Sequence, residues 1–369
     1  MKTKLQQYFP MIRTREDILK EINEKEWMKR TFYSWKEEAQ KEFLDFCSGA
    51  KGVKVLYDPY FKEIFNPESV PERLEDFLTS IIGKKIKIVQ VLPNDSVRLA
   101  DEESLLVTDI IVQLEDGTLA NIEVQKVGYA FPGQRAACYG ADLLLRQYKR
   151  ARDTKKKDFS YRDIKTVYTI VFFEKSTQDF HKFENTYVHM FEQKSNTGLE
   201  LDLLEKFIFI PLDIFKKNIH NKGNKNKMDE WLTFLSCDEP EEIIQLIEEQ
   251  PKFKELYQHI YDMCRNVEEV IGLFSEELRI MDRNTVRLML DEMQETIDSQ
   301  RIENNQLEKK NSQLTEEKNQ LTEEKNQLTE EKNQLKEENE KYAAEIHEKD
   351  QWIQQLLEER QVRQKSGID

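Results

Sequence analysis

The chain has 369 residues, with 56 Lys and Arg against 71 Asp and Glu, a formal net charge of −15, and only 11 Gly and 9 Pro. Charged residues make up 34% and apolar residues 38%, between the values of a globular domain and of a long solvated helix. This composition excludes collagen-like and Gly/Ser-linker chains. No apolar run approaches the roughly 18–20 residues that cross a bilayer, and charges interrupt the first residues where a signal peptide needs an apolar stretch. The sequence therefore predicts a cytoplasmic protein without a membrane partner.

Cysteine and histidine spacing argues against a zinc site. The four cysteines lie far apart and form no CxxC pair, so they predict reduced thiols rather than a disulfide framework. The five histidines form no HExxH pattern, which removes the usual zinc hydrolases. Any metal would have to be held by oxygen ligands.

Apolar periodicity predicts the elements in chain order. Residues 1–50 carry aromatic and aliphatic residues at helical spacing, which indicates short amphipathic helices. The pattern then predicts a helix over 70–82, strands over 86–92, 105–114 and 119–127, a helix over 131–150, and strands over 167–173, 187–191 and 207–212. The chain is predicted to be helical again over 231–294.

The two strands that meet at Asp116-Gly117 carry the most informative pattern. In the second strand Asn121, Glu123 and Gln125 alternate with apolar residues, so one face is apolar and the other polar. A two-residue loop would set Asp109 on the apolar side, where an unpaired carboxylate is costly. A three-residue loop over 115–117, with Gly117 in the left-handed conformation, sets Asp109 opposite Glu123, and we predict this loop or an equivalent bulge.

Two facing carboxylates beside an amide suit Mg²⁺, which takes one or two carboxylates and keeps several waters. Such an ion lowers the pKa of a bound water and polarises a phosphoryl oxygen, so the pattern favours phosphodiester hydrolysis. An oxygen site admits Mn²⁺ as well. The alternative from pattern alone is that Asp109, Glu123 and Gln125 form the solvent-exposed face of an antiparallel hairpin.

Basic residues cluster in two segments of the near-neutral first 240 residues, which hold 38 basic and 39 acidic side chains. Such clusters can neutralise the phosphates of a polyanion, although a charged run can also be only a solvated loop. The second cluster spans 216–227. The first cluster spans 146–165, and its residues predicted to bind nucleic acid are Arg146, Lys149, Arg150, Lys155, Lys156 and Lys157.

A seven-residue repeat near the C-terminal end predicts a coiled coil over 300–360. The motif LTEEKNQ occurs at Leu314, Leu321 and Leu328, and leucines fall on every seventh residue from 307 to 335. With these leucines at d, the a positions hold Asn and Lys, which favour a specific register and a low oligomer number, so a parallel homodimer is predicted. The alternative is a solitary helix held by i, i+4 Glu–Lys pairs, because Lys at three successive a positions makes a weak seam.

Three stretches taken together resemble a known family: DPYFKEIF (58–65), DIIVQLEDGTLANIEVQ (109–125) and FPGQRAACYGADLLLRQYKR (131–150). They are similar to the PD-(D/E)XK nuclease family transposases, relatives of the recombination-promoting nuclease (Rpn) group, and SEELRIMDRNTVRLMLDE (275–292) extends the likeness. The resemblance implies an α/β fold, a restriction-endonuclease-like mixed sheet flanked by helices, followed by a helical region and the coiled coil.

By this resemblance Asp109 and Glu123 bind the divalent metal, and Gln125 occupies the position where the family name expects Lys. A Lys there would carry charge toward the attacking water, whereas Gln only forms hydrogen bonds. The remaining candidate catalytic positions are Glu63 and Lys62 before the sheet, and Arg135 and Tyr139 four residues apart on one helix.

Two functions follow as hypotheses. The first is a Mg²⁺-dependent DNA endonuclease of the transposase or recombination-promoting type, with DNA as partner and the coiled coil joining two sites. The second is a catalytically degenerate nuclease fold that binds DNA or a protein and is assembled by the coiled coil. The expected organisation is an N-terminal helical segment (1–50), a nuclease-like domain (51–230), a helical region (231–299) and the coiled coil (300–360).

Overall fold

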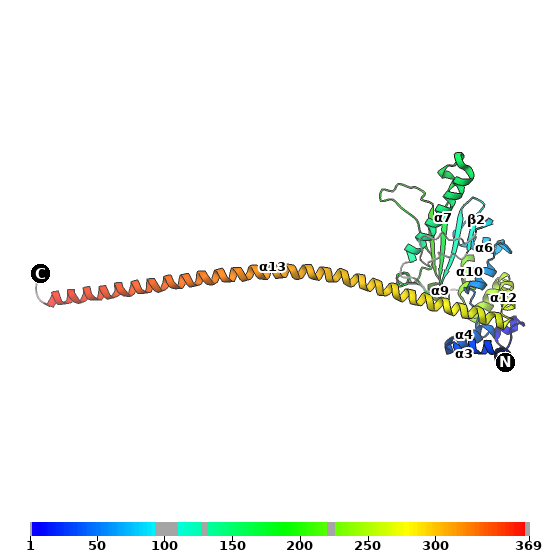
Figure 1. The fold of residues 1–369 in the computed structure, drawn as a ribbon, viewed down its shortest axis with the longest axis horizontal. Helices are drawn as coiled ribbons and strands as arrows, with labels where there is room; N and C mark the ends of the chain where they lie inside the picture. Colours follow the sequence, from blue (N-terminus) through cyan, green and yellow to red (C-terminus); the bar gives the residue numbers. More distant parts are fainter. Residues whose placement is uncertain (1, 93–109, 127–131, 220–225, 366–369) are drawn as a thin grey trace. The chain divides into compact units, whose positions relative to one another are not determined.

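A computed structural model of the chain describes residues 2–92, 110–126, 132–219 and 226–365. The chain divides into two compact units, Met1–Glu292 and Met293–Asp369. The first unit holds a six-stranded sheet with helices around it, and the described residues of the second belong to one long helix that begins in the first unit (Figure 1). The predicted α/β class is therefore confirmed.

The N-terminal segment forms short helices, as its apolar spacing predicts. These are α1 (Lys4–Tyr8), α2 (Arg15–Glu24), α3 (Glu26–Ser34) and α4 (Glu37–Cys47). The hydroxyl of Thr14 accepts a hydrogen bond from the backbone N–H of Asp17 and so caps α2. Ile18 and Ile22, on one face of α2, are buried in the main core, so this segment is part of the first unit's interior.

The sheet has the strand order β1-β2-β3-β4-β6-β5. The first three strands, β1 (Ile88–Val91), β2 (Ile110–Leu114) and β3 (Leu119–Gln125), pair antiparallel. The strands β4 (Val167–Phe173) and β6 (Glu205–Pro211) continue the sheet parallel to β3, and β5 (His189–Phe191) closes it as an antiparallel edge. The carboxyl ends of the parallel strands β3, β4 and β6 therefore lie side by side at the same end of the sheet.

Helices cover both faces of this sheet. Ile122, Ile170 and Ile208 occupy equivalent positions on three neighbouring strands and belong to the main core. That core also takes in helices before and after the sheet, which are α5 (Asp58–Ile64), α6 (Pro71–Ile82), α9 (Leu212–Ile219), α10 (Lys227–Ser236), α11 (Pro240–Glu249) and α12 (Lys252–Met263).

The opposite face of the sheet packs against α7 (Pro132–Lys155). Ala136 of α7 lies in one cluster with Val171 and Phe209, and Leu143 lies in another with Leu119. The helix links β3 to the parallel strand β4, and a parallel pair requires such a crossover. This face holds the polar residues of β3.

Most predicted element boundaries agree with the structure, and the differences are local. The strand β4 has the predicted bounds, because seven consecutive apolar and β-branched residues fill a strand buried on both faces. The helix α7 runs five residues beyond the predicted end at Arg150. Leu212, predicted to end a strand, instead begins α9. Residues 105–109 of the second predicted strand lie outside the described residues.

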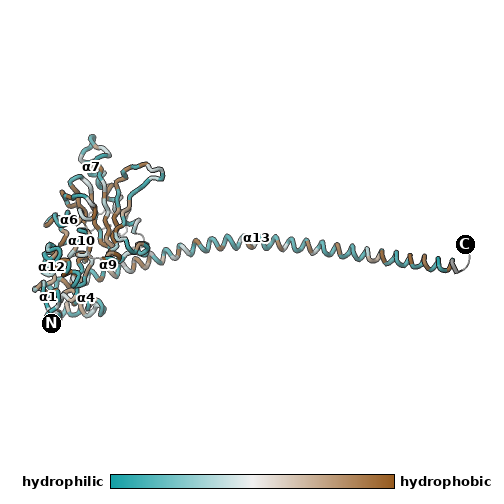
Figure 2. The backbone as a smooth tube through the Cα atoms, turned by 180° about the vertical axis from the view of Figure 1, so that it is seen from behind, coloured by the Kyte–Doolittle hydropathy of each residue, from teal (hydrophilic) through white to brown (hydrophobic). Residues whose placement is uncertain are grey.

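The last helix, α13 (Val267–Lys365), has 99 residues. Its first turns are buried in the core of the first unit through Val267, Ile271 and Phe274. Further along, apolar bands recur along a hydrophilic helix (Figure 2). Across the helices of the described part of the chain, none combines the length and the apolarity needed to span a bilayer.

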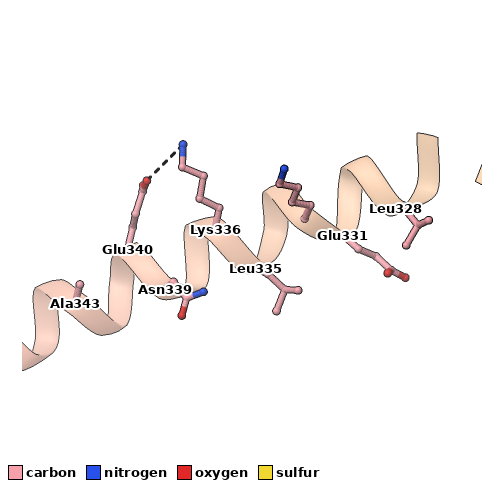
Figure 3. A pocket seen from close by; sticks show the side chains of 8 residues that line it. Leu328, Glu331, Leu335, Lys336, Asn339, Glu340 and Ala343 are labelled. Atoms are coloured by element: carbon pink, nitrogen blue, oxygen red, sulfur yellow. Dashed lines mark ion pairs between the residues drawn. The ribbon is translucent and has the colours of Figure 1, made fainter. Parts of the chain in front are cut away.

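The leucines of the seven-residue repeat lie on one side of α13. Leu328, Leu335 and Asn339 point to the same side, whereas the ion pair between Lys336 and Glu340 lies on the other (Figure 3). The repeat leucines from Leu307 to Leu335 are 50–65% exposed in the single chain. The apolar stripe that the heptad pattern predicts is therefore present, and it has no cover within the described residues of this chain.

Asp76 joins three helices of the first unit. Its carboxylate accepts hydrogen bonds of 3.0 Å from the indole N–H of Trp231 in α10 and from the ammonium of Lys252 in α12, and it forms an ion pair with Lys227. Burial acts to raise the pKa of Asp76, but the bonds from the two lysines outweigh it and hold the pKa below its usual value. Because the pKa of Asp76 is lower in the folded than in the unfolded state, its ionisation stabilises the fold at pH values above the unfolded-state pKa. This stabilisation is lost as the pH falls through the folded-state pKa.

We predict that Asp76→Ala lowers the free energy of unfolding by about 1–3 kcal/mol at neutral pH, because the buried indole N–H loses its acceptor. The difference from the wild type should shrink in acid, where the wild-type carboxyl is itself protonated. Urea unfolding at neutral and acid pH measures both values. Glu72→Ala, at an exposed position of the same helix, is the control and should change stability by less than about 0.5 kcal/mol. An Asp76→Ala effect of equal size at both pH values would contradict the role of the charge.

Candidate functional site beneath helix α7

The hairpin β2–β3 has the predicted three-residue loop. Ile110 pairs with Ile122 and Gln113 with Leu119, and the N–H of Leu114 donates to the carbonyl of Thr118 at 2.8 Å. This register leaves residues 115–117 as the loop, with Gly117 at a φ of +84°, a conformation in which a side chain would be strained. The predicted loop is confirmed. Asp109, which precedes the first residue of β2, lies outside the described residues.

The polar side chains of β3 are buried. Asn121 is 0% exposed, and Glu123 and Gln125 are each 4% exposed. The interpretation of these residues as a solvent-exposed hairpin face is therefore wrong for Glu123 and Gln125. The reason is the crossover helix α7, which covers this face of the sheet (Figure 1). A buried carboxylate is costly unless it is compensated by charge or hydrogen bonds, so the helix must supply partners.

Helix α7 brings Arg135 to Glu123 and places Tyr139 beside Arg135. The guanidinium Nε of Arg135 lies 3.6 Å from the Oε1 of Glu123, and the amide Nε2 of Gln125 donates to the same oxygen at 3.0 Å. Arg135 in turn lies 5.4 Å from the ring centre of Tyr139, one turn along the helix and itself buried. The structure therefore places Glu123, Gln125 and Arg135 together, with Tyr139 beside Arg135.

Several polar atoms beside Glu123 lack hydrogen-bond partners among the described residues. They are the Oε1 of Gln125, both amide atoms of Asn121, and the hydroxyl of Thr169, which pairs with Asn121 in the sheet. Buried polar groups are normally satisfied, so atoms of this kind mark a place for water, an ion or a substrate. Thr169 was not predicted as a site residue. A hydroxyl inside the apolar run 167–173 was its only sequence signal.

Glu205 of β6 is a further acid on this face, but it lies two strands from β3 and level with Leu119, four residues from Glu123. Gly140 of α7 packs so closely against it that a Cβ on this glycine would lie 2.7 Å from the Oε1 of Glu205. Burial raises the pKa of Glu205. Sequence reasoning missed Glu205, because the strand that it begins was predicted to start two residues later and its place under Gly140 depends on the tertiary fold.

The donor set fits a hard divalent cation. Carboxylate and amide oxygens, together with waters, are the ligands that Mg²⁺ takes in proteins. Glu123 supplies a carboxylate, and the amide oxygen of Gln125, which has no hydrogen bond to any described residue, is available to a water on the cation. Within the described ranges no three His, Cys, Asp or Glu side chains gather closely enough to hold a metal. The second carboxylate of the predicted pair, Asp109, lies outside those ranges.

Lys126 follows Gln125 directly but does not replace the lysine of the family motif. Its side chain lies 4.5 Å from the ring centre of Tyr57 and forms a buried ion pair with Glu277 of α13. Glu277 also accepts a hydrogen bond of 2.9 Å from the backbone N–H of Asp58, at the start of α5. These partners belong to the side of the sheet opposite α7, since neighbouring residues in a strand alternate in direction. The pair ties the end of β3 to α5 and α13.

Two candidates on α5 make their contacts away from the polar residues of β3. Glu63 lies 3.2 Å from the imidazole Nε2 of His259 in α12, and Lys62 pairs with Asp58 at 2.8 Å, one turn back along its own helix. Both side chains are about two-fifths exposed. The structure thus leaves Glu63 and Lys62 at the surface of the unit.

A Ser–His–Asp cluster elsewhere lacks the geometry of a hydrolase triad. The hydroxyl of Ser176 and the carboxylate of Asp213 both approach the same nitrogen of His181, Nε2, at 3.3 and 3.1 Å. A triad needs one partner on each ring nitrogen, so that the acid orients the base toward the nucleophile. We assign this cluster to the structure of the loop after β4.

We predict that Glu277→Ala lowers the free energy of unfolding by about 3–5 kcal/mol, because it leaves the ammonium of Lys126 buried beside fewer acceptors. The double variant Lys126→Met with Glu277→Gln should recover most of this stability, since Gln keeps the acceptor for Asp58 and no charge remains. Chemical denaturation of the single and double variants measures the difference. If the double variant is as unstable as Glu277→Ala, the loss comes from packing and not from charge.

Comparison with known proteins assigns the chain to a family. The model of the PD-(D/E)XK nuclease family transposases matches residues 55–287, more than half of the chain. Neither a curated protein nor a solved structure matches the chain. The matched range contains the whole sheet, α7 and the start of α13, and therefore every residue of the site. The chain belongs to the PD-(D/E)XK nuclease family transposases.

Proposed function

We propose that the protein is a divalent-metal-dependent DNA endonuclease that hydrolyses phosphodiester bonds. The observation that carries the proposal is the buried carboxylate of Glu123, with Gln125 and Arg135 beside it, in a chain of a nuclease family. The metal is proposed to be Mg²⁺, with Mn²⁺ as a substitute, because the donors are oxygens. The family relation also supports a role in transposition or recombination.

The proposed chemistry assigns a role to each side chain. Asp109 and Glu123 hold the cation, which would polarise the phosphoryl oxygen and lower the pKa of a bound water. The unpartnered Oε1 of Gln125 accepts a hydrogen bond from the attacking water and orients it. The water oxygen bonds to phosphorus and loses a proton to solvent, while the bond from phosphorus to the ester oxygen breaks and that oxygen takes up a proton from solvent. The products are a phosphate monoester and a hydroxyl.

Arg135 is proposed to supply the positive charge that Gln125 lacks. Its guanidinium already lies 3.6 Å from Glu123, and the fork of N–H donors suits the oxygens of a phosphate. Tyr139 packs against Arg135 and limits its movement. Glu63 and Lys62 remain flanking candidates, because their half-exposed side chains could reach a bound strand from α5.

The C-terminal half of α7 is proposed to bind the DNA backbone. Lys149, Arg150 and Lys155 are exposed there, and so are Lys156 and Lys157 in the 3₁₀ turn that follows it. Arg146 pairs with Asp142 at 2.7 Å and, with Lys149 and Arg150, lines a cavity of about 430 Å³ whose floor is apolar. The second basic cluster is less suited, because Lys216 pairs with Asp238 and Lys227 with Asp76.

We predict that the protein nicks or linearises supercoiled plasmid with Mg²⁺ or Mn²⁺ and not with EDTA. Asp109→Ala and Glu123→Ala should each lower the cleavage rate by about 100-fold or more, because each removes a charge that stabilises the transition state. Glu115→Gln is the matched control, since it changes an exposed carboxylate of the same hairpin and should cleave at the wild-type rate. Agarose-gel time courses measure the rates.

The second candidate function is a degenerate nuclease fold that binds DNA or a protein without cleaving it. Gln125 in place of Lys favours it, because the motif then lacks its usual cation. Cleavage that Asp109→Ala and Glu123→Ala leave unchanged would come from a contaminant. No cleavage by any form, with DNA binding intact, would select the binding function over the nuclease.

The leucine stripe of α13 is proposed to form a parallel homodimer that brings two sites to one DNA. Its leucines are exposed in the single chain, and Glu at g can reach a partner's Lys at the next a position. A reducing cytoplasm is the proposed location, since the described cysteines are free thiols and three of them are buried.

We predict a dimeric mass for the full chain in multi-angle light scattering. Replacement of Leu314, Leu321 and Leu328 by Gln should give a monomer, because it removes three successive d positions of the seam. The control replaces Glu316, Glu323 and Glu330 by Gln at f positions, away from the seam, and should remain dimeric. A monomeric wild type would instead support a solitary helix held by Glu–Lys pairs.

A further inference from the structure

Three aromatic rings gather at the end of α7, away from the hydrophobic cores. Tyr148 of α7 lies 5.5 Å from Phe159 and 6.1 Å from Tyr161, whose ring is nearly parallel to it at 17°. Phe159 and Tyr161 are 5.4 Å apart. Phe159 and Tyr161 follow the end of α7, in a segment that contains two short 3₁₀ turns, Lys156–Asp158 and Tyr161–Asp163. We call residues 146–165 the α7 knob.

The ring of Tyr161 is presented to solvent. The residue is 74% exposed, more than any other large apolar or aromatic residue that the structure describes as exposed. Tyr148 and Phe159 are only partly exposed and support it from beneath. An aromatic ring needed only for folding would bury its faces, so an exposed ring on an ordered base is suited to stacking on a ligand.

The α7 knob is also the most basic part of an acidic chain. It holds nine Lys and Arg and three acidic residues, in a protein with a net charge of −15. Only Lys155 and Arg146 of these nine form ion pairs among the described residues, with Asp163 and Asp142. Seven exposed cations lie in the same segment as the stacked rings, and one of them, Arg152, lies 5.7 Å from the ring centre of Tyr148. The seven are Lys149, Arg150, Arg152, Lys156, Lys157, Arg162 and Lys165.

We propose that the α7 knob binds single-stranded nucleic acid by stacking an unpaired base on Tyr161 while the surrounding cations hold the phosphates. Base pairs inside a duplex hide their faces from a protein ring, whereas an unpaired base offers one, and such stacking works with any base. A surface that bound only the duplex backbone would need the cations but not the ring. Binding of single-stranded nucleic acid does not depend on the proposed nuclease function. Only the identification of the bound strand as the substrate rests on that function.

The α7 knob lies within reach of the site along one helix. Arg135 and Arg152 are both on α7, 17 residues apart, which corresponds to about 25 Å at the rise of an α-helix. A strand with the base spacing of B-form DNA covers this distance in about seven nucleotides. A strand cut beside Glu123 can thus keep an unpaired end on Tyr161.

Binding of fluorescein-labelled oligonucleotides, followed by anisotropy with the full chain in EDTA, tests the proposal without any cleavage. The probes are a 20-nucleotide oligo-dT, an oligo-rU of the same length and a 20-base-pair duplex. Tyr161→Ala should weaken oligo-dT and oligo-rU binding by about 10-fold or more and duplex binding by less than about twofold, because it removes a stacking surface and no charge. Tyr161→Phe, which keeps the ring, should bind like the wild type.

Two further variants separate stacking from charge. Tyr33→Ala removes a half-exposed tyrosine of α3, outside the α7 knob, and should leave all binding unchanged. Lys156→Gln with Lys157→Gln should weaken oligo-dT and duplex binding together and lower the salt dependence. Equal losses on oligo-dT and duplex for Tyr161→Ala, or no loss on either, would overturn the proposal.

The outcome is independent of the nuclease assay. Binding of oligo-dT through Tyr161 without cleavage of plasmid would support this inference and contradict the proposed nuclease function. Loss of oligo-dT binding in the Tyr161→Phe variant would also contradict the proposal, because stacking depends on the ring and not on the hydroxyl.

Discussion

The structure depends on one costly feature, a carboxylate buried between a sheet and a helix. Glu123 is 4% exposed, and an ionised group at this depth requires a compensating charge or hydrogen bonds. Arg135 and Gln125 supply part of this compensation. The unpartnered oxygen of Gln125 and the hydroxyl of Thr169 show that the polar face is not fully satisfied by described residues. The proposed cation would add to this compensation and would also supply the proposed chemistry.

The hairpin and the crossover helix together create this feature. The three-residue loop sets the register in which Ile110 pairs with Ile122, and the strand alternation then directs Asn121, Glu123 and Gln125 to one face. Helix α7 covers that face and carries Arg135 and Tyr139 at its beginning and basic residues at its end. The buried pair of Lys126 and Glu277 anchors the end of β3 from the other side. The strand β3 thus links the site to α13, the helix that continues into the leucine repeat.

The sequence predicted the local parts of this arrangement and not the tertiary ones. The bounds of β4 follow from seven consecutive strand-forming residues, and the loop follows from the cost of burying a carboxylate on an apolar face. Burial of Glu123 could not be predicted, because it depends on where α7 packs. Thr169 was missed for the same reason, since strand pairing across the chain brings it beside Asn121.

Binding of Mn²⁺, measured by electron paramagnetic resonance with the wild type and Glu123→Gln, tests the central claim most directly. Gln keeps the shape of Glu but removes its charge, so the account predicts that this variant binds Mn²⁺ at least about 10-fold more weakly. Glu115→Gln serves as the control and should bind like the wild type. Equal Mn²⁺ binding by the wild type and Glu123→Gln would contradict the assignment of the buried carboxylate as a metal ligand.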